Sequence, residues 1–308
     1  MLKKLPLPVT GVALGFAALG NLIESYSAGL RLVCGAVSLI LLLLFLAKTI
    51  AYPSTFVEDM KNPIMASVFG TFSMALMLLA GYAKPYIGGA AAILWYAGIL
   101  IHILLIIYFT WKFMMKPVMP KVFASYFIVY VGIVVASVTS PTFEALTIGQ
   151  AAFWFGFILL LLLLVFVTYR YVKFKEVPDP AKPLFCIYTA PASLCLAGYM
   201  QAFPEKSAVL AWLLAVLALV LYIVVLIKLP GYLKMPFFPS YAAFTFPFVI
   251  SAIGMKMFQA YLVASGNPLR GLSVLELAET VIAAVLVIYT LVRYLMFWFG
   301  AAAKKNEK

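Results

Sequence analysis

Ten long apolar stretches set the strongest limit on what this chain can fold into. They cover residues 6–26, 29–51, 63–83, 87–111, 118–139, 147–171, 183–203, 207–229, 238–264 and 271–299. Each is long enough for an α-helix that crosses the hydrocarbon core of a bilayer, which needs about 20 residues. Charged residues make up only 10% of the chain, too few for a water-soluble fold to cover its surface. The sequence therefore predicts an all-α integral membrane protein with ten transmembrane helices.

The connections between the stretches are short, so residues 1–308 are expected to form a single transmembrane domain. Residues 300–308 would follow it as a short cytoplasmic tail. The N-terminal run has the lysines and apolar residues of a signal peptide. Pro6, Pro8 and the lack of a small-residue cleavage site nevertheless favour a first membrane helix.

The basic residues predict which way the chain crosses the membrane. With ten spans both termini lie on the same side, and most of the 22 Lys and Arg residues fall in the loops of that side. The opposite side receives only Arg31, Lys84, Lys206 and Arg270. Since positively charged loops stay in the cytoplasm, both termini are expected to be cytoplasmic, in the plasma membrane or, in a bacterium, the inner membrane.

A proline opens every odd-numbered stretch, which indicates an internal repeat. These leading prolines are Pro8, Pro63, Pro120, Pro183 and Pro239, at intervals of 55 to 63 residues. The odd stretches carry Gly, Ser, Thr, Tyr and Pro, as at helix contacts or wet cavities, whereas the even stretches are rich in leucine. We therefore expect odd helices inside and even helices outside, in five hairpins with pseudo-fivefold symmetry around a central pore. The hairpins cover roughly 6–51, 63–111, 118–171, 183–229 and 238–299. The alternative is that the prolines only mark helix starts, where a missing N–H costs little.

Aligning the repeats on their leading prolines predicts what the pore contains. Seven residues further, about 10 Å along a helix, the aligned residues are Gly15, Gly70, Phe127, Ala190 and Phe246. This level would open a passage between small residues that an aromatic ring can close. Pro191 and Pro247 follow directly, and each is expected to kink its helix beside a wet cavity. Kinks that serve packing alone are the alternative.

Charged residues give two further expectations. Lysines close to the leading prolines, together with the N-termini of the odd helices, should make the cytoplasmic mouth electropositive. They are Lys61, Lys121 and Lys182, and the preference of basic loops for the cytoplasm alone could also explain them. Lys256 is the one basic residue within a stretch and is a candidate pore charge. Glu276 and Glu279 share a face of the last helix and could instead pair with Lys256.

Several classes of function have no support in the sequence. Nucleophile–base motifs, phosphate-binding glycine loops and paired aspartates are missing, so no enzyme activity is expected. Cys34, Cys186 and Cys195 match no metal or redox spacing, and His102 is expected to be a buried hydrogen-bonding residue. We therefore predict no cofactor and no bound metal. The net charge of +12 lies in membrane loops, which disfavours nucleic acid as a partner.

Two segments resemble a known family. PLPVTG at residues 6–11, followed by GFAAL at 15–19, is similar to the start of the TehA tellurite-resistance/dicarboxylate transporter (TDT) family. AFTFP at 243–247 resembles that family's gate segment, in the form closest to the plant guard-cell slow anion channels of the same superfamily. The resemblance implies a homotrimer in which every protomer has its own pore, lined by the odd helices. It also implies that Phe246 plugs that pore.

Together these features predict an anion channel, or a channel-like uniporter, for small monovalent anions such as chloride or nitrate. The expected partners are small inorganic anions and the lipid bilayer. A positive pore that binds weakly suits conduction, because tight sites slow it. The alternative is a secondary transporter of dicarboxylates or other organic anions, with or without coupling to protons.

Overall fold

Long apolar helices dominate the structure. The computed structural model describes residues 2–306, and no β-strand occurs among them. Eight helical segments are long and apolar enough to cross a membrane, and α1 (Val9–Ile23) is a shorter apolar helix. One of the eight, Pro63–Met114, contains two of the predicted spans. The predicted all-α fold is thus confirmed, whereas the five-hairpin arrangement and its symmetry stay predictions.

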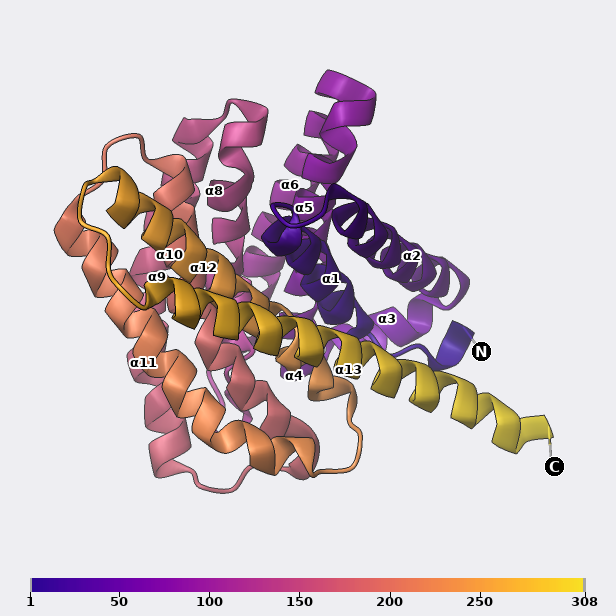
Figure 1. The fold of residues 1–308 in the computed structure, drawn as a ribbon. Helices are drawn as coiled ribbons and strands as arrows, with labels where there is room; N and C mark the ends of the chain where they lie inside the picture. The colour runs from indigo at the N-terminus through magenta and orange to yellow at the C-terminus, as the bar shows by residue number, and fades with distance from the viewer. Residues whose placement is uncertain (1, 307–308) are drawn as a thin grey trace.

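The outer layer consists of long helices. They are α2 (Ala28–Ala51), α6 (Ala91–Phe109), α9 (Leu146–Lys173), α11 (Ala208–Leu233) and α13 (Leu272–Asn306). In α2, α9, α11 and α13 only 33% of the most apolar window is buried inside the protein. Leucine-rich faces therefore remain free for lipid. Figure 1 shows α13 crossing the front of the molecule, where it packs against α12 and α1.

The inner layer consists of shorter and broken helices. They are α1, α4 (Pro63–Val68) with α5 (Gly70–Ile87), α7 (Tyr126–Val131) with α8 (Val135–Thr139), α10 (Ala190–Ala202) and α12 (Phe246–Ala264). The segment that contains α10 is 89% buried in its most apolar window, and the segment that contains α12 is 67% buried. These odd stretches are therefore more buried than the outer helices. The amphipathic helix α3 (Pro53–Met60) joins α2 to α4.

The two internal prolines produce a larger break than the expected kink. The 3₁₀ helix η7 (Asp179–Thr189) precedes α10, and η8 (Pro239–Phe244) precedes α12. Pro191 and Pro247 lie in the first turn of α10 and α12 respectively, rather than inside a continuous helix. A proline fits there because first-turn N–H groups have no partner within the helix. The inner segments thus change helix type partway along their length.

Outer helices hold two of the leading prolines in place. Arg170 Nη2 of α9 donates to Pro120 O at 3.0 Å, and Tyr294 Oη of α13 donates to Pro239 O. Pro120 and Pro239 each lie in a 3₁₀ turn at the start of an inner segment. These bonds therefore fix the start of an inner segment to the outer helix that follows it.

Candidate functional site

Two cavities lie between the inner helices. The first, which we call the proline-side cavity, has a volume of about 370 Å³ and is lined by the leading prolines Pro8, Pro120 and Pro239. The second, the far-side cavity, has a volume of about 580 Å³ and is lined by the C-terminal parts of α1, α5, α10 and α12. Each cavity is lined by residues from all the inner segments, and we refer to the two cavities together as the path.

One face of each inner segment contributes to this path. Residues three, four or seven positions apart lie on one side of a helix, and the lining follows that spacing. The wall residues are Gly11, Leu14 and Ala18 of α1; Thr71, Met74, Leu78 and Gly81 of α5; Ile128, Val131, Val135 and Val138 along α7 and α8; Ile187, Ala190, Leu194 and Gln201 along η7 and α10; and Ala243, Phe246, Ile250, Ile253 and Met257 along η8 and α12.

Two residues line both cavities, Phe246 and Leu194. Phe246 is 5% exposed and Leu194 is 2% exposed, although each faces the cavities. Their side chains therefore lie at the junction where the two cavities meet. Sequence reasoning missed Leu194. It lies one helical turn after Ala190 and seven residues from Ile187, and this spacing was the signal that could have identified it.

The position of Phe246 is fixed by the residue before it. Thr245 ends η8 with φ −98° and ψ −98°, and α12 begins at Phe246. Thr245 Oγ1 shares its proton between Gly11 O at 2.9 Å and Ala242 O at 2.7 Å. Because Thr245 is fully buried, these bonds tie the break in the η8–α12 segment to α1.

Gly15 contributes to this contact instead of lining the path. A Cβ on Gly15 would lie 2.7 Å from Thr245 Oγ1 and 3.1 Å from the backbone nitrogen of Phe246. Only a residue without a side chain lets α1 approach the turn so closely.

The proline-side cavity is lined by several residues that the sequence placed in the pore. They are Phe127, Ala190, Pro191, Phe246 and Pro247. Gly70, like Gly15, lies elsewhere, since its missing side chain makes room for Ile128, Leu105 and His102. Equal distances from the leading proline do not give equal orientation. A 3₁₀ segment has 3.0 residues per turn and an α-helix has 3.6, so the faces drift apart.

Lys256 lies on the far-side cavity. Its ammonium donates to Leu22 O at 3.1 Å and to Ser25 Oγ at 2.7 Å. In the described part of the chain it forms no ion pair with Glu276 or Glu279. The role of Lys256 as a pore charge stays a prediction.

The proline-side cavity carries little charge. Of the three lysines expected at this mouth, only Lys121 lines it. Lys61 forms an ion pair with Glu58 at 2.9 Å and Lys182 forms one with Asp179 at 2.5 Å. The hydrogen bond and negative charge of Glu58 raise the pKa of Lys61. Two of the three positive charges are therefore matched by carboxylates.

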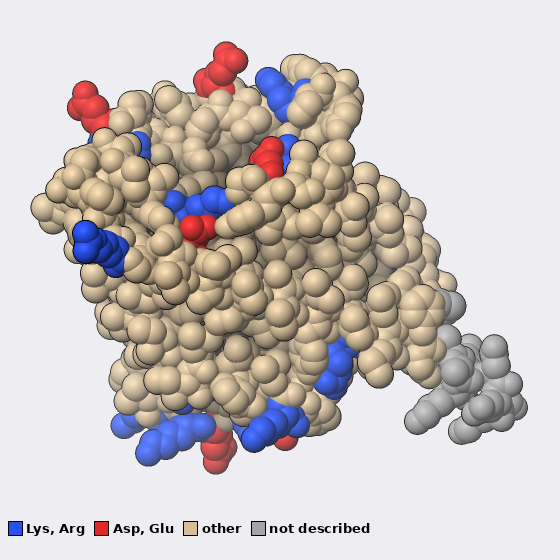
Figure 2. Space-filling model, viewed as in Figure 1, with Lys and Arg blue, Asp and Glu red and all other residues tan. Residues whose placement is uncertain are grey.

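The far-side cavity is the more charged of the two. Arg31, Lys84 and Lys256 line it, and Glu24 is the one carboxylate in its described lining. Figure 2 shows a hollow at the upper end of the molecule with blue and red side chains near it. A path with excess positive charge at one cavity attracts anions and repels cations.

His102 is a structural residue outside the path. Its Nε2 lies 3.0 Å from Val129 O and its Nδ1 lies 2.7 Å from Ser73 Oγ. A carbonyl can only accept, so Nε2 carries the proton and Nδ1 accepts from the hydroxyl. Among the residues the structure describes, no group of His, Cys, Asp and Glu side chains could hold a metal ion.

Comparison with known proteins assigns a family to this architecture. The model of the SLAC1 family, described as voltage-dependent anion channel, matches residues 4–295, which include every wall of the path. No curated protein matches the chain.

Proposed function

Since the chain belongs to the SLAC1 family of voltage-dependent anion channels, we propose that it conducts small monovalent anions such as chloride or nitrate along this path. Phe246, assisted by Leu194, occludes the path. The observation that carries the proposal is that these two side chains alone face both cavities in the described structure. Movement of the Phe246 ring would join the cavities.

The chemistry of the path supports an anion that is bound weakly. The hydroxyl of the lining residue Thr71 is bonded to Val68 O and Thr10 Oγ1. The segments α10 and α12 begin close to the junction, where helix N-termini carry partial positive charge. The wall residues next to Phe246 are otherwise apolar. Weak attraction without a tight site suits rapid conduction.

The assembly and the orientation that we propose rest on the resemblance to TDT proteins and on the loop charges. The resemblance to TDT proteins implies a homotrimer with one path per protomer. The loop charges support cytoplasmic termini, and the proline-side cavity would then face the cytoplasm. The apolar faces of α2, α6, α9, α11 and α13 would meet lipid or neighbouring protomers.

A coupled carrier of dicarboxylates is the second candidate. The observation that favours it is the group of cations in the far-side cavity, because two positive side chains could hold the two carboxylates of one substrate. In that case the two cavities would open alternately, and Phe246 would separate them during the cycle.

Replacement of Phe246 tests the proposal. Phe246→Ala, reconstituted in planar bilayers with a chloride gradient, should raise the anion current well above that of the wild type, with the reversal potential near that of chloride. Phe155→Ala is the matched control, since Phe155 is 40% exposed on the outer helix α9. An unchanged current in a folded Phe246→Ala protein would refute the gate. Saturable exchange without current would favour the carrier.

A further inference from the structure

We propose that the far-side cavity is an anion-binding vestibule, in which Arg31, Lys84 and Lys256 hold the permeating anion and Glu24 competes with it for Arg31. The inference rests on the proposed function only in taking the ligand to be the conducted anion, a small monovalent species such as nitrate. Beyond the proposed function, the inference names the residues that bind the anion and identifies the Glu24 carboxylate as a competitor for Arg31.

Each of the three cations lies over an aromatic ring, and among the described residues only Arg31 also pairs with a carboxylate, that of Glu24. Arg31 Cζ lies 4.5 Å from the ring centroid of Tyr82. The ammonium of Lys84 lies 5.6 Å from the ring of Phe143, and that of Lys256 lies 5.2 Å from the ring of Tyr26. A ring attracts a cation without cancelling its formal charge. The cavity therefore keeps most of its positive charge for a ligand.

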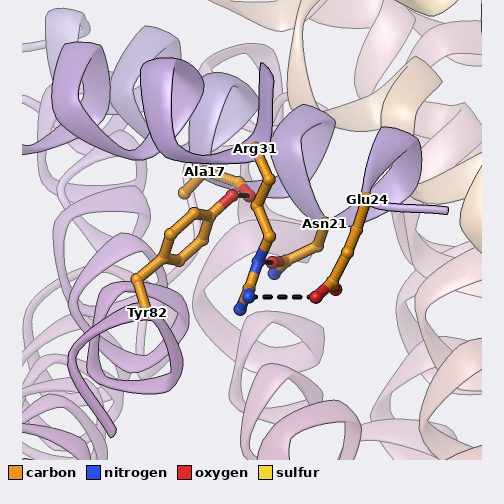
Figure 3. A network of polar contacts seen from close by, with 5 residues as sticks. All are labelled: Ala17, Asn21, Glu24, Arg31 and Tyr82. Carbon is orange, nitrogen blue, oxygen red and sulfur yellow. Dashed lines mark hydrogen bonds and ion pairs between the residues drawn. The ribbon is translucent and has the colours of Figure 1, made fainter. Parts of the chain in front are cut away.

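Arg31 is positioned before any ligand arrives. Tyr82 Oη donates to Ala17 O at 2.7 Å, and the ring fits beside Gly35, where a Cβ would approach within 2.6 Å of it. Figure 3 shows the guanidinium of Arg31 beside this ring and directed toward Asn21 and Glu24. A site whose donors are already oriented loses less entropy when it binds.

The cations retain donors for an anion. Arg31 uses Nε for Asn21 Oδ1 at 3.3 Å and Nη1 for Glu24 Oε1 at 3.0 Å. A guanidinium has five N–H groups, so Arg31 has further donors beyond these two. The ammonium of Lys256 likewise uses two of its three N–H groups, for Leu22 O and Ser25 Oγ.

Glu24 is placed to act as a tethered anion. Its carboxylate occupies one edge of the Arg31 guanidinium, as Figure 3 shows. The side chain of Glu24 is 52% exposed and that of Arg31 is 21% exposed, and ion pairs this exposed contribute little stability. A dissolved anion can therefore displace Glu24 from Arg31, and the carboxylate can return when that anion leaves.

Nitrate binding to the purified full chain tests the inference without requiring conduction. Thermal unfolding is followed in detergent while sodium nitrate replaces sodium gluconate at constant ionic strength. Glu24→Gln removes the competing charge but keeps an acceptor for Arg31, and should tighten nitrate binding up to about fivefold. Arg31→Gln and Lys84→Gln should each weaken binding about tenfold or more. Arg270→Gln, a charge removed outside the cavity lining, should bind nitrate like the wild type.

The outcomes separate this inference from the proposed function. Nitrate binding that is unchanged in folded Arg31→Gln and Lys84→Gln proteins, or weakened equally in Arg270→Gln, would overturn the vestibule. Glu24→Gln with unchanged or weaker binding would overturn the competition. Any of these results could occur together with a large current through Phe246→Ala. The proposal that Phe246 is the gate would then be supported, whereas the proposed anion site would be refuted. If Arg31→Gln fails to fold, nitrate binding to Lys84→Gln still tests the anion site, and nitrate binding to Glu24→Gln still tests the competition.

Discussion

Gly15→Ala should disturb the position of Phe246 through the contact between α1 and the turn at Thr245. Gly15 lies on α1 where this helix meets the turn that sets Phe246, and an added Cβ would lie 3.1 Å from the Phe246 nitrogen and still closer to Thr245. The neighbours are a buried backbone and a β-branched side chain held by two hydrogen bonds. Neither can rotate away, so α1 or the turn must shift.

The size of the effect follows from two opposing contributions. An extra methyl group in a tightly packed core costs about 1–3 kcal/mol. Alanine is favoured over glycine within a helix by roughly 0.5–1 kcal/mol, which offsets part of that cost. The net loss of roughly 1–2 kcal/mol should lower the Tm by about 2–3 °C, because the entropy of unfolding of a chain of 308 residues is large. A displaced turn should also leave Phe246 less well seated and raise the anion current, although less than Phe246→Ala does.

Thermal unfolding in detergent and planar-bilayer current are the two measurements. Gly231→Ala is the matched control because nothing lies within 4 Å of an added Cβ there; it should leave the current unchanged and, since Gly231 lies within α11, raise the Tm by about 1 °C. A Gly15→Ala protein with wild-type Tm and wild-type current would show that the contact between α1 and the Thr245 turn does not position the gate. A lower Tm with unchanged current would make the contact structural only.

Two other substitutions test neighbouring parts of the path. Leu194→Ala should raise the current in the same bilayer assay, by less than Phe246→Ala, because Leu194 is the smaller of the two residues at the junction; an unchanged current would leave closure to Phe246 alone. Arg170→Met should lower stability by about 3 kcal/mol, measured as a fall in Tm, because the buried guanidinium donates to three backbone carbonyls. Lys173→Met, on the exposed face of the same helix, is its control, and an equal Tm in both variants would refute the role of Arg170.

The fold could be predicted because the hydropathy of each stretch can be read from the sequence without knowing which segments contact each other. Lipid requires long apolar helices, and the contrast between leucine-rich and proline-containing stretches separated the outer layer from the inner. Phe246 and Ala190 were placed on the lining by their distance from a leading proline, and both line the proline-side cavity. Both segments begin with a 3₁₀ helix between the leading proline and the lining residue. The seven residues in between therefore turn by a similar angle in both, and the aligned residues face the same way.

The remaining features depend on contacts between segments distant in sequence. Gly15 meets Thr245 across 230 positions, and Tyr82 of α5 supports Arg31 of α2. Periodicity shows which residues share a helix face but not which helix that face meets. Arg31 appeared in the sequence only as a loop charge on the less basic side, with no sign that a ring and a carboxylate hold it. Leu194 was hidden because leucine is also the commonest lipid-facing residue.

The residues along the path argue against proton coupling. Membrane proton carriers use Asp, Glu or His along their route, and among the described lining residues of both cavities Glu24 is the only one of these types. His102 lies outside the path, and Glu279 is buried in α13 away from the described lining. No titratable carboxyl or imidazole therefore stands at the junction where a proton would have to pass Phe246. In a chloride gradient, the reversal potential of Phe246→Ala should stay the same when the pH on one side is changed by two units. A shift toward the proton equilibrium potential would contradict a simple channel, and Glu24→Gln would then show whether that carboxylate carries the proton.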